Sequence, residues 1–177
     1  MISDIGSLKL GLVLSMLTLI IGISMGVLFG ANEDGVKDYI SEGIASHQSL
    51  HDENSQSKIW RYAQRAHFHA TGVAAFALVL ILITGATSLT RSGKFAASTL
   101  IGIGSFYPLS WFSMFLLSPS MGRDGAHHAL AIELITMVSV GCLSIGILMV
   151  IYALLTSRTR DSQRSIADAP SADRAFS

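Results

Sequence analysis

The sequence predicts an all-α integral membrane protein, a four-helix bundle with both termini in the cytoplasm and one short amphipathic helix on the outer side. Of its 177 residues, 50% are hydrophobic and 14% are charged, whereas charged residues make up about 25% of an average soluble domain. Four apolar runs each reach the length of about 20 residues that a helix needs to cross a bilayer. Helices are expected because hydrocarbon cannot satisfy backbone polar groups, which must therefore pair within the segment.

The transmembrane domain is expected to cover residues 1–157, with a disordered cytoplasmic tail at 158–177. The first run is interpreted as a retained helix, because it is longer than the apolar region of a signal peptide and no small-residue cleavage site follows it. The spans are placed at about 10–30, 66–89, 95–117 and 126–156, and the outer loop at 31–58.

Basic residues set the expected orientation. Lys9 precedes the first span, Arg91 and Lys94 lie between the second and third, and further arginines follow the fourth. An even number of crossings puts these segments on one side, which the positive-inside rule assigns to the cytoplasm. We therefore expect the lipid bilayer of a bacterial inner membrane as the surroundings. The formal net charge of zero predicts no nucleic-acid partner.

The outer loop begins with a segment typical of an amphipathic helix, NEDGVKDYISEGIASH. Its apolar side chains Val36, Tyr39, Ile40 and Ile44 fall near one face at helical spacing. Asn32 is the expected N-cap residue, because its side chain can accept a hydrogen bond from the first turn. We expect this helix either to lie on the membrane surface or to cap the bundle.

Two histidine pairs carry the strongest functional signal. His67 and His69 enter the second span, and His127 and His128 enter the fourth, so both pairs lie at a similar shallow depth on the outer side. Imidazole near hydrocarbon is costly unless something uses or satisfies it. Two helices that present imidazole at one depth predict a site for haem iron or for a copper, iron or zinc ion.

The spacing within the first pair favours haem b. Residues two apart on a helix differ by about 200°, so His67 and His69 point almost oppositely and cannot share one metal ion. In the haem form one histidine from each helix is an axial ligand, with His69 and His128 as first choices. His67 and His127 are the next choices. Gly72 would leave room for the ring, and Arg61, Arg65 or Arg123 would pair with its propionates.

In the competing form, a copper, iron or zinc ion is held by several histidines together with Glu133. A carboxylate in an apolar run is costly without a partner, and Glu133 shares a helical face with neither histidine of its own run. We therefore expect its partner across the bundle. The candidate ligands of this form are His67, His69, His127, His128 and Glu133, and the candidate partners of Glu133 are Arg65, His69, Thr71 and Tyr107.

A plainer interpretation needs no cofactor, because interfacial histidines can hydrogen-bond to headgroups, loop carbonyls or each other. The function thus stays open between cofactor binding with electron transfer, metal handling without redox turnover, and a non-catalytic accessory or assembly subunit of a membrane complex. No pattern of a nucleophile with its base and no phosphate loop is present, so no enzymatic activity is assigned.

The segment AHFH, which contains His67 and His69, is similar to a segment in subunit I of the haem-copper oxidases. In that family the two histidines face opposite sides of one helix and ligate different haems. The segment GAHHAL, with His127 and His128, resembles the adjacent pair that holds copper there. The resemblance covers these two short segments, and it implies only a geometric precedent for His67 and His69.

Small residues and a proline indicate packing features. Gly22, Gly26 and Gly30 repeat every four residues, which lets two helices approach closely. They either pack the first span inside the bundle or form a contact with a homodimer mate or another membrane protein. Pro108 is expected to kink the third span, where Tyr107 and Trp111 form either an interfacial belt or one wall of a cofactor pocket.

Overall fold

The computed structural model describes the backbone of residues 5–167 and the side chains of residues 5–156. This part of the chain contains helices and no strand, which confirms the predicted all-α class. The elements, in chain order, are α1 (Ile5–Ala31), α2 (Glu33–Ser46), the 3-10 turn η1 (Gln48–Leu50), α3 (Ser55–Ala86), α4 (Arg91–Gly104), α5 (Pro108–His127) and α6 (Leu130–Ala167).

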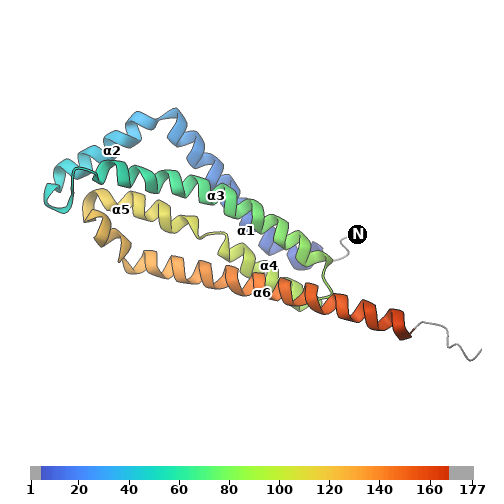
Figure 1. Cartoon of the computed structure of the whole chain (residues 1–177). Helices are drawn as coiled ribbons and strands as arrows, with labels where there is room; N and C mark the ends of the chain where they lie inside the picture. Colours follow the sequence, from blue (N-terminus) through green and yellow to red (C-terminus); the bar gives the residue numbers. More distant parts are fainter. Residues whose placement is uncertain (1–4, 168–177) are drawn as a thin grey trace, which may run out of the picture.

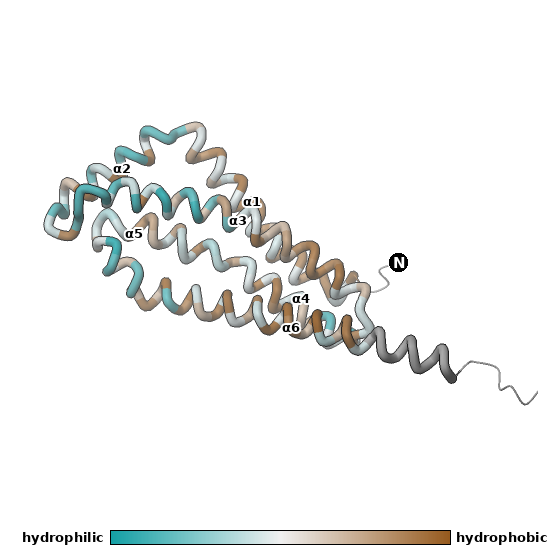
Figure 2. Tube along the Cα trace, in the orientation of Figure 1, coloured by the Kyte–Doolittle hydropathy of each residue, from teal (hydrophilic) through white to brown (hydrophobic). Residues whose placement is uncertain are grey.

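Four helical segments of the described chain are long and apolar enough to cross a membrane, as predicted. They are Ile5–Ala31, Ser55–Ala86, Arg91–His127 and Leu130–Thr156. The segments run side by side, with α2 and the end of α5 at one end and the turn between α3 and α4 at the other (Figure 1). Polar residues gather at the first of these ends, which we call the α2 end, and apolar residues dominate toward the other (Figure 2).

Helix α3 extends well beyond the predicted second span. Its 32 residues measure about 48 Å at 1.5 Å per residue, compared with about 30 Å for the hydrocarbon core of a bilayer. The extra turns are the polar ones from Ser55 onward, which project at the α2 end. At the opposite end the Lys94 ammonium donates a hydrogen bond to the Gly85 carbonyl at 2.7 Å, which satisfies one of the last carbonyls of the helix.

The third apolar segment is two helices, where the sequence predicted one kinked span at 95–117. Pro108 is the first residue of α5, and α4 ends at Gly104. Proline cannot donate a backbone hydrogen bond, so it is best accommodated in the first turn of a helix. Pro108 therefore disrupts the span, as predicted, but it separates two helices where a kink in one helix was expected. The Ser105 hydroxyl in this break lies 2.9 Å from the Thr18 hydroxyl of α1.

The α2 helix caps the bundle, which is one of the two placements expected for it. Val36 and Ile40 are buried in a cluster with Phe29 of α1, Ile59 of α3 and Phe115 of α5. Asn32 stands at the N-cap position, as predicted, and its side chain makes no capping hydrogen bond.

The small-residue stripe of α1 packs against α3 of the same chain. A Cβ added to Gly22 would lie 2.8 Å from the Cβ of Ala70, and one added to Gly26 would lie 2.5 Å from Cε1 of His67. A Cβ on Gly30 would meet nothing within 4 Å. These contacts correspond to the intramolecular alternative, and a homodimer through the stripe stays a prediction.

The last helix differs from the expected end of the chain. α6 begins at Leu130, whereas the fourth span was placed from residue 126, and its backbone is helical to Ala167. The helix thus continues into the segment that was predicted to be a disordered tail. The remainder of that segment, 168–177, lies outside the described residues.

A charged turn precedes α3. Asp52 Oδ1 accepts hydrogen bonds from the Asn54 N–H at 3.0 Å and the Ser55 hydroxyl at 2.9 Å, and Oδ2 lies 2.9 Å from the Lys58 ammonium. The Lys58 ammonium, followed by the Ser55 hydroxyl, lowers the pKa of Asp52 from 3.8 to about 2. The turn is thus organised around an ionised carboxylate.

We expect acid to loosen this turn locally. Because the pKa of Asp52 is lowered in the folded chain, its contribution is present above the ordinary value of 3.8 and is lost as the pH falls through about 2. Hydrogen exchange of the first amides of α3, corrected for intrinsic rates, should show less protection near pH 2 than at neutral pH. In Asp52→Asn the protection should already be low at neutral pH; identical profiles for the two chains would contradict the assignment.

Candidate functional site

The side chain of His67, on α3, packs against α1 at Gly22 and Gly26. Its ring is half-buried on α3, and Nδ1 is 2.8 Å from the Gly22 carbonyl oxygen. Because a carbonyl can only accept, Nδ1 carries the hydrogen and donates it, which leaves Nε2 as the nitrogen that could bind a metal. The absence of a side chain at Gly26 makes room for the ring. His67 thus joins two helices.

His69 faces away from α1, as the helical spacing predicted. Its Nδ1 donates to the Arg65 carbonyl at 2.9 Å, and its ring lies 5.8 Å from the rings of both Tyr107 and Trp111 on α5. The Arg65 guanidinium stacks 4.9 Å from the Trp111 ring centroid, whereas the sequence analysis named it as a partner for a haem propionate. Gly72 is exposed, and a Cβ there would meet nothing within 4 Å.

The second histidine pair does not begin a transmembrane helix, which corrects the prediction. His127 is the last residue of α5, and α6 begins at Leu130 after a short turn. The rings of His127 and His128 are 5.1 Å apart and both are exposed. The reversal of chain direction between α5 and α6 places the pair at the α2 end.

Glu133 finds its partner within its own segment, so the expected partner across the bundle was wrong. It lies in the first turn of α6, and its Oε1 is 3.3 Å from Nδ1 of His128. The prediction assumed that one continuous helix contains both His128 and Glu133. The chain instead turns before Leu130, and this turn brings the two side chains together. Because Glu133 is exposed, its carboxylate is not enclosed in the core.

The acidic and imidazole groups near His128 do not converge on one point. Asp124 Oδ1 lies 3.8 Å from Nε2 and Glu133 Oε1 lies 3.3 Å from Nδ1, so the two carboxylates approach different nitrogens of the ring. Within the described residues, no group of three or more His, Cys, Asp or Glu side chains could hold a metal ion. The set predicted from His67, His69 and the other candidates is therefore not assembled in this chain.

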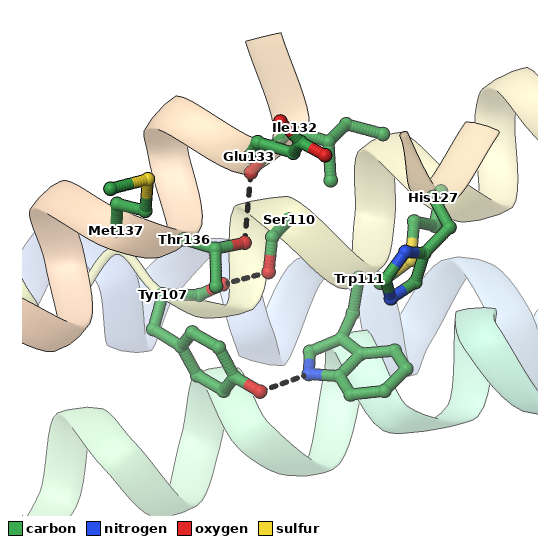
Figure 3. Close-up of a pocket in the computed structure, with 9 residues that line it drawn as sticks. Tyr107, Ser110, Trp111, His127, Ile132, Glu133, Thr136 and Met137 are labelled. Atoms are coloured by element: carbon green, nitrogen blue, oxygen red, sulfur yellow. Dashed lines mark hydrogen bonds between the residues drawn. The ribbon is translucent and has the colours of Figure 1, made fainter. Parts of the chain in front are cut away.

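A cleft of about 350 Å³ opens between α5 and α6. The aromatic rings of Tyr107 and Trp111, joined by a 2.9 Å hydrogen bond from the indole N–H to the hydroxyl, lie on one side (Figure 3). Side chains of α6 lie on the other, and His127 is at one end (Figure 3). The lining residues are Tyr107, Ser110, Trp111, Met114, His127, Ile132, Glu133, Thr136 and Met137.

A second, polar cavity of about 390 Å³ lies at the α2 end. It is lined by Tyr62 of α3 and by Arg123, Asp124, His127 and His128, which follow the break in α5 at Gly122. Gly122 has a φ of 74°, a conformation that favours glycine. Since His127 lines both cavities, the cleft and the polar cavity are neighbours.

The structure therefore brings some of the predicted site residues together and separates others. His127 and Glu133 share the cleft, and His127 and His128 share the polar cavity. His67 and His69 line neither cavity. Thr136 and Met137 were missed, because nothing in the apolar sequence of α6 marks the face that meets α5.

Comparisons with protein-family models, with curated proteins and with solved structures found no match for this chain.

Proposed function

We propose that the chain is an integral protein of a bacterial inner membrane, with both termini in the cytoplasm, that binds a small amphipathic molecule in the cleft between α5 and α6. One observation carries this proposal: the cleft combines the polar groups of His127 and Glu133 with an apolar wall that includes Trp111. Small-molecule sites typically have apolar and aromatic walls with a few polar groups that orient the ligand.

The position of the cleft supports entry from a bilayer. One side of the cleft is formed by α6, which is long and apolar enough to span a membrane. Only 17% of the most apolar 18-residue stretch of this helix is buried inside the bundle. Met137, which lines the cleft, is 71% exposed, and the neighbouring Leu134 is 51% exposed. A ligand with an apolar body would thus meet apolar surface both outside and inside the cleft.

Haem b belongs to the same chemical class, because its ring is apolar and it carries carboxylates. His127 is the histidine that this cleft presents to it, while His69 lies behind the Tyr107 and Trp111 rings. The predicted axial pair of His69 and His128 gains no support from this arrangement. The accessory-subunit alternative rests on no specific contact, so we favour the ligand-binding function.

Filling the cleft tests the proposal. The chain has two tryptophans, so a Trp60→Phe background leaves Trp111 in the cleft wall as the only tryptophan, which is excited selectively over the tyrosines. In phosphatidylcholine nanodiscs, ω-bromododecanoate should quench Trp111 with saturation, because bound bromine lies near the indole. Thr136→Phe should abolish the saturable part, since Thr136 lines the cleft and its hydroxyl bonds only within α6 at 2.8 Å.

Leu148→Phe is the matched control, because Leu148 is 63% exposed on the same helix and does not line the cleft. Equal, non-saturating quenching in all three chains would refute the proposal. An absorption spectrum of the purified chain tests whether the ligand is haem. A Soret band that is lost in His127→Ala and kept in His69→Ala would assign haem to this cleft.

A further inference from the structure

The polar cavity next to the cleft contains a cation without an acidic partner. Arg123 lines the cavity, and its Nε is buried without a hydrogen-bond partner. Within the described chain, no ion pair or hydrogen bond to the Arg123 guanidinium is present. A guanidinium that lines a cavity and has no partner in the described chain has donors available to a ligand.

The nearby carboxylates do not neutralise Arg123. Asp124 and Glu133 both approach His128, at 3.8 and 3.3 Å. The Asp124 side chain is also fully exposed, so water screens its charge. The positive charge of Arg123 is therefore not matched by either neighbouring acid.

Two further groups could donate hydrogen bonds into the same cavity. The Tyr62 side chain is 9% exposed and lines the cavity, and its hydroxyl has no hydrogen-bond partner among the described residues. His127 lines the cavity from the end of α5. Guanidinium, phenol and imidazole together suit an oxyanion, because an arginine fork matches carboxylate and phosphate oxygens.

We infer that the polar cavity binds an oxyanion, a carboxylate or a phosphate, through Arg123 and Tyr62. Because His127 borders both cavities, this oxyanion is the head of the amphipathic ligand whose apolar body occupies the cleft. The second part of the inference rests on the proposed function. It narrows the ligand class to acidic amphiphiles, such as a fatty acid or an alkyl phosphate.

The test compares ligands that differ only in the head group. In the Trp60→Phe chain in phosphatidylcholine nanodiscs, saturable quenching of Trp111 is measured with ω-bromododecanoate and with ω-bromododecanol, each at matched bilayer concentrations. A charge-assisted hydrogen bond to arginine should make the acid bind about tenfold tighter or more. Arg123→Gln should remove that preference, and Tyr62→Phe should reduce it several-fold.

Arg61→Gln is the matched control, because Arg61 is an exposed arginine of α3 that lines neither cavity. It makes the same change in net charge and should keep the preference. Arg123→Lys retains the charge and should keep part of it, which guards against a folding defect in Arg123→Gln. Equal affinities for acid and alcohol in the unaltered chain, or equal losses in the two glutamine variants, would overturn the inference.

Free anions separate this inference from the proposed function. Acetate and inorganic phosphate are tested alone by thermal shift, since they lack an apolar body. If they stabilise the chain through Arg123 while neither bromoalkyl probe gives saturable quenching, the oxyanion site stands and its connection to the cleft is overturned. If the alcohol and the acid bind equally and Thr136→Phe blocks both, the cleft stands and the oxyanion site fails.

Discussion

Replacing Gly11 by alanine is expected to destabilise the bundle by about 2–3 kcal/mol or more, the cost of overpacking a site that cannot relax. A Cβ at this position would overlap the carbonyl oxygen of Ser98 on α4 and lie 2.6 Å from its carbonyl carbon. Both atoms belong to the backbone, so no side-chain movement can relieve the contact. A Cβ on Gly102 would likewise lie 2.8 Å from Cα of Gly11. Helices α1 and α4 therefore meet backbone to backbone.

The matched control is Gly30→Ala on the same helix. A Cβ there would meet nothing within 4 Å, and alanine has a higher helix propensity than glycine by up to about 1 kcal/mol. The melting temperature in nanodiscs should fall in Gly11→Ala and stay level or rise in Gly30→Ala. Similar melting of Gly11→Ala and the unaltered chain would mean that α1 and α4 are not in this close contact.

Hydropathy was sufficient to predict the four long helices, because a long apolar run has one favourable structure in hydrocarbon. The segments Ile5–Ala31 and Ser55–Ala86 match the predicted first two spans in position, with extra turns at their ends. Hydropathy cannot locate these ends accurately, because the first turns of α3 are helical although they are polar. The helix of the outer loop was also predicted, because Val36 and Ile40 mark its buried face.

The breaks near α5 were harder to predict, and they decide the site. The opposite directions of His67 and His69 followed from the helical period, because α3 is continuous across them. The same period gave a wrong result for His128 and Glu133, because a turn separates them. The apolar residues Leu130, Ala131 and Ile132 follow the turn directly, so a hydropathy profile does not mark where α6 begins.

The lining of the cleft depends on packing that a single sequence does not reveal. Which face of α6 meets α5 is fixed by where α6 crosses α4. At that crossing a Cβ on Gly104 would lie 2.5 Å from Cβ of Leu143, and a Cβ on Gly146 would lie 2.7 Å from Cγ1 of Ile101. This close contact at one end, with the turn at the other, leaves space for the cleft.

Trp111→Ala is expected to weaken both the fold and the ligand site. The Trp111 ring contacts Tyr62 and His69, each at 5.8 Å between centroids, carries the Arg65 guanidinium at 4.9 Å, and donates to the Tyr107 hydroxyl at 2.9 Å. Removing the ring should cost about 3 kcal/mol of stability, the lower end for truncating a large aromatic side chain, because this ring is half-buried. The melting temperature should fall, and equilibrium binding of radiolabelled dodecanoate should weaken about tenfold or more as the cleft loses its wall.

Trp111→Phe separates the contribution of the ring from that of the indole N–H. It keeps an aromatic face for His69 and Arg65 but loses the hydrogen bond to Tyr107, which should cost about 1 kcal/mol. Dodecanoate should therefore bind to Trp111→Phe nearly as well as to the unaltered chain. If Trp111→Ala melts and binds like the unaltered chain, the aromatic wall does not support the bundle or the ligand. If phenylalanine is as damaging as alanine, the indole hydrogen bond is the essential contact and stacking contributes little.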